Sequence, residues 1–186
     1  AIDGAHIRVR QGVTLEKPIH IIFLSRATKH PILHFPRVEI DVEANAHVRI
    51  IETYAAEKEP SEQPTLTCAL TRARLAQGGR CEILKHQSES PLGFHVALTQ
   101  AQLARDSHWT HQNFVLGARW SRDDIQASLE GEGAEAHIDG LYLTRDQHLD
   151  IQTVIDHRVP NCQSNELYKG VLDGKGEGVF NGKIFV

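Results

Sequence analysis

Three short stretches of the sequence share one pattern: "IDVEANAHVRI" (40–50), "ARLAQGGRCEI" (73–83) and "AQLARDSHWTH" (101–111). Each has an apolar residue, then a run of small or polar residues, then a second stretch of alternating apolar and polar residues. The pattern returns with one extra residue in "SLEGEGAEAHI" (128–138) and with less fidelity in "LDGKGEGVFNG" (172–182). Alternation at spacing two predicts strands, and the small residues between them predict tight turns.

The apolar anchors of these units, Val42, Leu75, Leu103 and Leu129, are 33, 28 and 26 residues apart. Units of this length without helical segments predict a β-solenoid, in which each unit forms a layer about 4.8 Å thick. We expect about five to seven layers, with a small residue at each corner. A jelly-roll sandwich also contains many short strands, and the unequal spacing keeps it as the alternative.

Composition excludes several classes of function. The net charge of −4 and pI near 6.3 give no electrostatic reason to bind nucleic acid or an anionic membrane surface. Aromatic residues make up 6% of the chain, too few for a base-stacking platform. The chain has three cysteines and no C-x-x-C pair, which is typical of a reducing compartment and predicts a cytoplasmic protein.

The two ends of the sequence predict a core segment. It begins "AIDGAHIRV", contains no Met, and ends "NGKIFV" in a strand-like pattern. No internal boundary interrupts the repeats. We therefore expect residues 1–186 to form a single β-helix core domain that is truncated at both ends.

The segment "RDQHLDIQTVIDH" (145–157) resembles a metal site at first, with two histidines and three aspartates. As a strand it places His148 and Asp150 on a polar face, opposite the inward set Leu149, Ile151, Thr153 and Ile155. His148 and His157 would then be about 30 Å apart, so one ion cannot bridge them. His148 and Asp150, joined by a residue one layer away, remain weak metal-ligand candidates. A solvated or partner-facing strand is the commoner explanation.

Two further sets of residues do not form a site by their spacing. His108 and His111 are three apart, which puts them on opposite faces of a strand and argues against a shared ligand role. Cys68 has Leu66 and Leu70 at matching spacing, and we expect it in the core.

An enzymatic function needs more than this sequence offers. A β-solenoid acting on polysaccharide would need carboxylates gathered on one exposed face, for which Asp139, Asp150 and Asp156 were considered. Asp139 differs in parity from the other two, and Asp150 and Asp156 are far apart along one strand. No P-loop or G-x-S-x-G motif is present. We expect no catalytic residue; a carbohydrate-active solenoid enzyme and a histidine-rich metal-binding β protein remain the alternatives.

Residues 139–186 resemble the SufB/SufD family of iron–sulfur cluster assembly proteins, and specifically its SufD branch. The resemblance includes Asp139-Gly140, Pro160, "ELYKG" (166–170) and "VFNGKIFV" (179–186). Its individual family-motif residues are Gln147, His148, Asp150, Thr153, His157, Ser164, Tyr168, Lys169, Gly170, Phe180, Asn181 and Gly182. A SufB-like chain is expected to carry an Arg-Gly ending where this one has "YKG".

The resemblance implies a right-handed parallel β-helix whose flanking helical domains lie outside this sequence. It implies a non-catalytic scaffold that pairs with a SufB-like subunit and with SufC-like ATPases, the latter through regions missing here. A transient iron–sulfur cluster would form in the assembled complex, with no cofactor held tightly by this segment. We also expect self-association through the open strand edge at "KIFV", and neither nucleic acid nor membrane as a partner.

Overall fold

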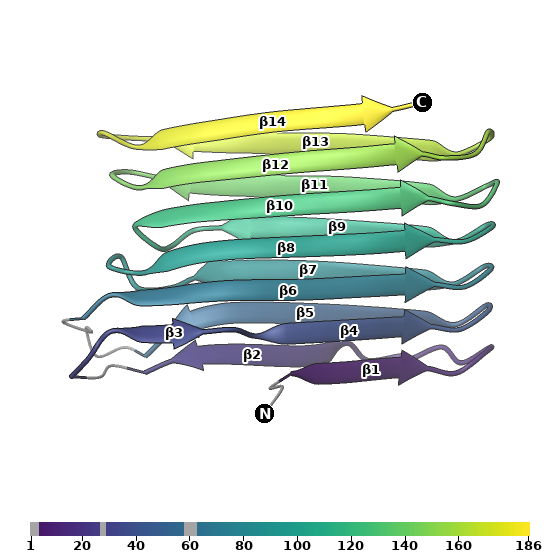
Figure 1. Cartoon of the computed structure of the whole chain (residues 1–186), viewed down its shortest axis with the longest axis horizontal. Coiled ribbons are helices and arrows are strands. Elements are labelled where there is room, and N and C mark those ends of the chain that lie inside the picture. The colour runs from purple at the N-terminus through teal and green to yellow at the C-terminus, as the bar shows by residue number, and fades with distance from the viewer. Residues whose placement is uncertain (1–3, 27–28, 58–62) are drawn as a thin grey trace.

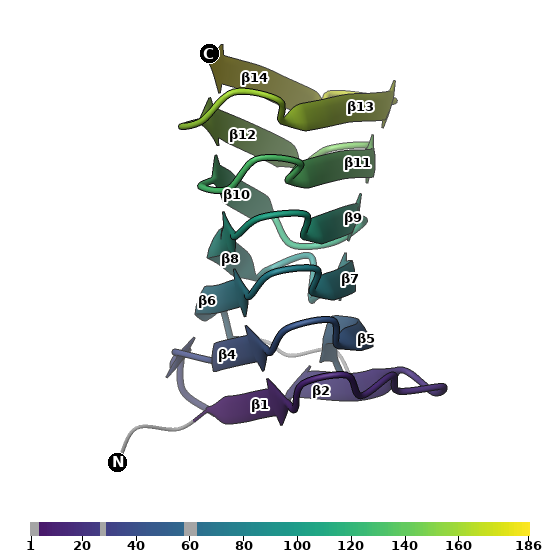
Figure 2. The ribbon, with the colours of Figure 1, turned by 90° about the vertical axis from the view of Figure 1, so that its right-hand side faces the viewer.

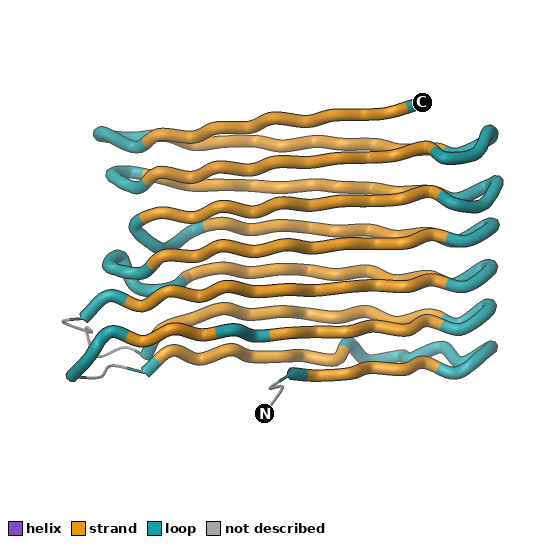
Figure 3. The backbone as a smooth tube through the Cα atoms, viewed as in Figure 1, coloured by secondary structure: helices purple, strands orange, loops and turns teal. Residues whose placement is uncertain are grey.

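The computed structural model describes residues 4–26, 29–57 and 63–186, and its regular structure consists of strands. Figure 3 shows long rows of strand joined by short loops, with no helix in the described part of the chain. The all-β expectation is confirmed. Within these ranges there is accordingly no helix long and apolar enough to cross a membrane.

The strands form two sheets, each built from parallel pairs. Sheet A contains β1 (Ala5–Val9), β3 (Ile32–His34), β4 (Arg37–Val42), β6 (Thr65–Leu75), β8 (Phe94–Leu103), β10 (Trp120–Leu129), β12 (His148–His157) and β14 (Glu177–Phe185). Sheet B contains β2 (Ile19–Ser25), β5 (His47–Ala56), β7 (Arg80–Ser88), β9 (His108–Val115), β11 (Glu135–Thr144) and β13 (Gln163–Leu172).

The chain alternates between the sheets as it rises, so that β6 pairs with β8 while β7 lies in the opposite sheet. In Figure 1 the strands of sheet A run to the right in front and those of sheet B run to the left behind, which makes the coil right-handed. Figure 2 shows the two sheets facing each other, one layer above the next. Parallel pairing excludes the jelly roll, and the 6-stranded sheet B agrees with the predicted layer number.

The anchors of the repeat stack in one column of sheet A. Val42 is the register partner of Leu75, Leu75 of Leu103, and Leu103 of Leu129. All four side chains are buried. The unequal sequence spacing is therefore absorbed by loops, while the strand register stays constant from layer to layer.

Each corner that leads from sheet A to sheet B holds one residue in the left-handed region. These residues are Gly12, Asn45, Gly78, Asp106, Gly133 and Asn161. Their backbones hydrogen-bond between layers: Asn45 N donates to Gln77 O and Gly78 N to Arg105 O, both at 2.9 Å. Glycine, asparagine and aspartate tolerate this conformation best, which explains the small and polar residues of the repeat.

Along sheet A, the face that carries the apolar side chains changes. In β6, Thr67 and Thr71 point inward and are buried, whereas Leu66, Cys68 and Leu70 point outward and are partly exposed. The prediction that Cys68 lies in the core was therefore wrong. In this part of β6 the larger apolar side chains therefore lie on the outer face, and threonine side chains lie on the inner face.

Candidate functional site

The interior of the solenoid is divided lengthwise into an apolar and a polar half. The apolar half lies where the strands of sheet A end and those of sheet B begin, and there Leu103 packs with Ile83 and Trp109 in one core cluster. The polar half lies at the opposite end of the same strands. The charged and amide side chains that it buries, which we call the interior polar cluster, are Glu52, Lys85, Gln87, Glu89, His95, His111, Asn113 and Asp123.

Strand parity places these groups inside. β5 buries every second side chain, in the order Val48, Ile50, Glu52, Tyr54. β7 does the same with Cys81, Ile83, Lys85, Gln87. Since side chains alternate strictly between the faces of a strand, a charged residue at this parity must lie between the sheets.

Lys85 and Asp123 form the central ion pair, one residue from each sheet. Lys85 Nζ donates to Asp123 Oδ1, and each side chain is 2% exposed. Asn113 Nδ2 donates to Asp123 Oδ2 at 3.3 Å. Burial alone would raise the pKa of Asp123, but the positive charges of Lys85 and His95 outweigh it and hold that pKa below its usual value. Asp123 is thus a fixed anion neutralised by Lys85.

Glu52 is a second buried carboxyl group. Thr71 Oγ1 donates to its Oε1 at 3.0 Å, and the Tyr54 hydroxyl donates to its Oε2 at 3.2 Å. Burial raises the pKa of Glu52 in spite of the nearby charge of Lys85. Lys85 Nζ also lies 5.3 Å from the centroid of the Tyr54 ring, so one ammonium group faces both an aromatic ring and two carboxyl groups.

Glu89 and His95 extend the cluster toward the N-terminal end. His95 Nδ1 lies 2.7 Å from Glu89 Oε2, Thr67 Oγ1 donates to Glu89 Oε1 at 2.5 Å, and Gln87 Nε2 donates to Oε2 at 3.0 Å. Burial would raise the pKa of Glu89, but the contact with His95 and its charge lower it overall. His95 Nε2 is 4.0 Å from Asp123 Oδ1 and so connects Glu89 to the central ion pair.

His111 marks the border with the apolar half. Its ring centroid lies 5.4 Å from that of Trp109. Both His111 ring nitrogens and Trp109 Nε1 are buried with no hydrogen-bond partner in the described part of the chain. Burial, followed by the charge of Lys85, lowers the pKa of His111 to about 3, so the imidazole is neutral at neutral pH.

The cluster meets the surface at one groove. This groove, of about 740 Å³, is lined by His34, Thr67 and Glu89 together with the exposed side chains of Leu33 and Phe35. Glu89 therefore connects the buried network to a solvent-accessible cleft at the N-terminal end of the solenoid.

The interior polar cluster holds its charged groups in fixed pairs. Its carboxyl groups are paired with a lysine, a histidine or hydroxyl groups, and not with one another. Across residues 4–26, 29–57 and 63–186, no three His, Cys, Asp or Glu side chains converge as metal ligands. The chemistry that this geometry supports is neutralisation of buried charge between two sheets.

His148 and Asp150 lie on the outer face of β12, each held by a neighbouring strand. His148 Nδ1 is 3.0 Å from Glu177 Oε2, and Arg122 donates to Asp150 Oδ2 at 2.9 Å. His157 lies at the opposite end of β12 from His148, which confirms the predicted separation. His108 and His111 also point to opposite faces, as predicted.

The three aspartates considered for a carbohydrate enzyme do not gather on one face. Asp139 belongs to β11 in sheet B, while Asp150 and Asp156 belong to β12 in sheet A. Asp156 accepts a hydrogen bond from Arg158 at 2.9 Å. No pair of these carboxyl groups flanks a common cleft.

Two tyrosines near the C-terminal end each cover a glycine on the neighbouring strand. Gly140 is the register partner of Tyr168, and Tyr142 is the register partner of Gly170. A Cβ atom on Gly140 would lie 1.9 Å from Tyr168 Cε1, and one on Gly170 would lie 2.2 Å from Tyr142 Cζ. The Tyr168 ring also stacks on Phe180, with centroids 4.9 Å apart. These motif residues thus close the interior by shape complementarity.

Other residues of the predicted motif hold turns and corners. Gln147 Oε1 accepts hydrogen bonds from the backbone N–H groups of Arg145 at 2.8 Å and Asp146 at 3.2 Å, in the turn before β12. His157 Nε2 lies 2.9 Å from Ser164 Oγ, across the corner between β12 and β13.

The last motif residues lie on β12, β13 and β14. Asn181 Nδ2 donates to Gln152 Oε1 at 2.8 Å, which ties β14 to β12. A Cβ atom on Gly182 would lie 2.9 Å from Glu166 Oε2 and 3.1 Å from Thr153 Oγ1, so this position has little room for a side chain. Lys169 points outward and is exposed.

Sequence reasoning missed the interior polar cluster. The detectable signal is a charged residue at the inward parity of an otherwise apolar strand, as Glu52 is in β5 and Lys85 in β7. Taken singly, such residues resemble the polar face of a strand.

The comparisons with known proteins agree with this geometry. Residues 23–186 match the core domain of SufBD, described as SUF system FeS cluster assembly. The chain belongs to the SufBD core-domain family. This confirms the family resemblance, together with its parallel β-helix.

Individual relatives carry related names. The chain is 27% identical over 99% of its length to an iron–sulfur cluster assembly SufBD family protein of Synechocystis sp., of which it covers 42%. It is 26% identical over 97% of its length to the iron–sulfur cluster assembly protein SufD of Escherichia coli, of which it covers 43%. A SufBD family protein of Mycobacterium leprae is 37% identical over 43% of the chain and is covered to 21%. The chain thus spans less than half the length of these SufBD proteins.

Proposed function

We propose that this SufBD core is a SufD-type, non-catalytic scaffold of the cytoplasmic SUF machinery, which pairs with a SufB-like subunit. SufC-like ATPases would join through parts of the full-length relatives outside this chain. The nascent cluster would be cargo of the assembled complex, with no cofactor held tightly by this segment. The "YKG" at 168–170 and the similarity to SufD of Escherichia coli support the SufD type.

The observation that carries the scaffold proposal is the open end of the solenoid at β13 and β14. Among the described strands, β13 pairs only with β11 and β14 only with β12. The large apolar side chains exposed there are Leu167, Val171, Leu172, Val179, Phe180, Ile184 and Phe185. Free strand edges lined by apolar side chains pair readily with another chain.

Purification with partners tests the proposal. We expect the protein to be recovered in one complex with SufB-like and SufC-like subunits from the same source. Ile184→Lys, which puts a charge on the open end, should reduce recovery of the SufB-like subunit at least fivefold. Leu24→Lys is the matched control, since Leu24 is 53% exposed and Ile184 54% exposed, at opposite ends of the solenoid.

Metal analysis of the same preparation separates the alternatives. Recovery of the protein alone, with zinc, iron or manganese at one equivalent, would overturn the scaffold proposal. It would direct attention to His148 and Asp150 as a metal site.

A further inference from the structure

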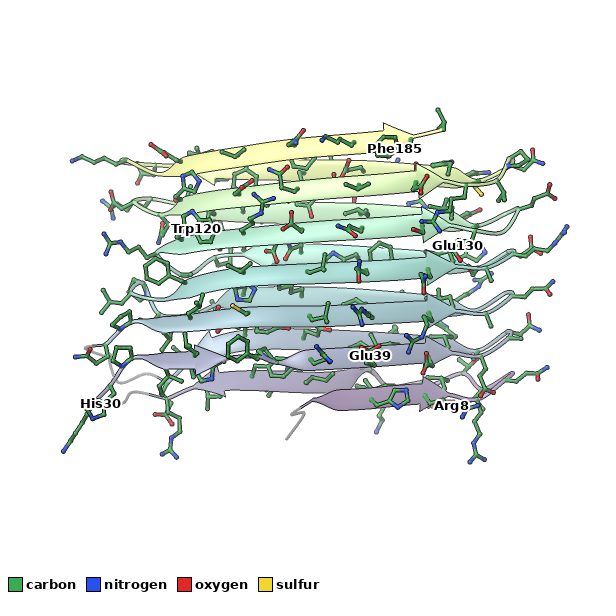
Figure 4. All side chains as sticks on the ribbon, in the orientation of Figure 1. Arg8, His30, Glu39, Trp120, Glu130 and Phe185 are labelled. Carbon is green, nitrogen blue, oxygen red and sulfur yellow. The ribbon has the colours of Figure 1, made fainter. Side chains whose placement is uncertain are left out.

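The outer face of sheet A carries a continuous apolar surface over the polar half of the interior. We call it the outer apolar patch, made of Leu33, Phe35, Leu66, Cys68, Leu70, Leu92, Phe94, Val96, Leu98 and Trp120. Leu33, Leu66, Phe94 and Trp120 form one register column across four strands. Figure 4 labels Trp120 at the start of β10, on the side of sheet A that faces the viewer.

This surface departs from the rest of the same sheet. On β12 the outward positions hold Asp150 and Gln152, as expected for a sheet face in contact with water. On the patch, Leu33 is 62% exposed and Phe35 65% exposed. The patch fills three residue columns on β6 and β8, while on β10 Trp120 is followed outward by Arg122 and Asp124. Exposed apolar side chains gathered on one face of a sheet make this face a candidate interaction site.

Two arginines stand at opposite corners of the patch. Arg37 is the register partner of Leu70 at the lower corner, and Arg119 precedes Trp120 and lines a hollow beside Phe94 at the upper corner. Neither forms an ion pair with any residue in the described ranges, whereas Arg122 pairs with two aspartates. Five residues along the strand and three layers across separate the two arginines by about 22 Å.

We propose that the outer apolar patch is the docking site for an amphipathic α-helix of a partner protein, about 15 residues long, with acidic side chains near both ends of its apolar face. A helix rises about 1.5 Å per residue, so this length spans the two arginines. The backbone of β6 and β8 is already paired on both sides, so a strand cannot add here. A helix carries its own backbone hydrogen bonds and packs readily on a sheet.

Charge favours this occupant over a second copy of the chain. A two-fold contact of the patch with itself would oppose these arginines wherever its axis runs along or across the line between Arg37 and Arg119. Acidic residues on a helix would instead neutralise both. The patch is also separate from the open edge of β13 and β14, so the two surfaces can be tested independently.

Binding to a designed helix tests the proposal. The probe is a fluorescein-labelled, helix-stapled 15-residue peptide with leucines on one face and glutamates near both ends; its control carries lysines in place of the glutamates. We expect the glutamate peptide to bind at least tenfold more tightly than the lysine peptide. Leu98→Asp should weaken the glutamate peptide at least tenfold, and Arg37→Glu with Arg119→Glu should reverse the preference between peptides.

Gln102→Asp is the matched control: it also points outward from β8 but lies beyond the patch, and it should leave binding unchanged. Methyl NMR shifts should be confined to residues such as Leu66, Leu70 and Leu98. Equal binding of the two peptides, or no effect of Leu98→Asp in a folded variant, would overturn the proposal. Dimerisation abolished by Leu98→Asp would also overturn it, in favour of a second copy.

Discussion

Lys85 of sheet B and Asp123 of sheet A meet as an ion pair in the middle of the solenoid, where each side chain is 2% exposed. Removing two charges from water costs several kcal/mol per ion, so the pair offers little net stability over an apolar pair of similar size. The pair instead disfavours other registers of the two sheets, because a shift of one residue in either sheet would leave both charges unpaired. The pair therefore helps to define how the two sheets face each other.

Asp123→Leu is expected to destabilise the protein by about 3–5 kcal/mol, since it removes the carboxylate that forms an ion pair with the buried Lys85 ammonium group. The double variant Lys85→Met with Asp123→Leu should recover most of that loss. Urea unfolding of the single and double variants measures both values.

The matched control is a surface pair on the same sheet. Arg122 pairs with Asp124 and Asp150 on the outer face. Arg122→Gln should lower the free energy of unfolding by about 1 kcal/mol or less. If Asp123→Leu lowers the free energy of unfolding no more than Arg122→Gln does, Asp123 is not needed to neutralise the buried Lys85.

Stability should fall as the pH drops below about 6.5, through His111. Its pKa is about 3 in the folded protein against an ordinary value of 6.5, so between these values the unfolded chain binds a proton that the folded chain does not. The free energy of unfolding then decreases by up to about 1.4 kcal/mol per pH unit as the pH falls. His111→Gln should flatten this slope between about pH 6.5 and 4.5, as measured by urea unfolding at several pH values.

The lower limit of that window avoids the carboxyl groups whose pKa values are lowered. The raised pKa of Glu52 acts in the opposite direction, because folded Glu52 takes up a proton more readily than the unfolded chain, and this effect is common to the His111→Gln variant and the unaltered protein. The depressed pKa values of Asp123 and Glu89 cause a further loss of stability only below the ordinary values of these groups, 3.8 and 4.5. Changing the exposed His137 to Gln is the control and should leave the slope unchanged. An equal slope in His111→Gln and the unaltered protein would contradict the assignment.

The fold was predictable because each repeat of the sequence specifies the same local geometry. Val42, Leu75 and Leu103 recur beside residues that tolerate the left-handed corner, and stacking such units is enough to specify a solenoid. The face that each strand turns inward was harder to predict. Around Cys68 the leucines face out and the threonines face in. The usual rule that the apolar side of a strand faces the core therefore predicts the wrong face here.

The interior polar cluster could not be assembled from sequence for a related reason. Lys85 and Asp123 are 38 residues apart and belong to different sheets, so their contact depends on layer register and on the distance between sheets. Only the separations within one strand, such as that of His148 from His157, follow from the local rise of the chain.

Gly140→Ala should destabilise the protein by about 2–3 kcal/mol, because the new Cβ would lie 1.9 Å from Tyr168 Cε1. In a Tyr168→Ala background the same substitution should cost less than about 1 kcal/mol, since the ring that it would meet is gone. A double-mutant cycle from thermal or urea unfolding measures the coupling. Additive costs would show that the Tyr168 ring does not pack against Gly140.

Self-association through the open end should depend on concentration and on β13 and β14. The free edges there expose Leu167 and Ile184, 52% and 54% accessible, and a two-fold pairing of edges would bury both. We expect analytical ultracentrifugation to show a dimer that Leu167→Lys with Ile184→Lys dissociates at least tenfold more readily. Leu24→Lys, at the other end of the solenoid, should have no effect. A monomer at every concentration would contradict edge pairing. So would a dimer lost equally in both variants, because a contact at β13 and β14 is affected by the double variant and not by Leu24→Lys.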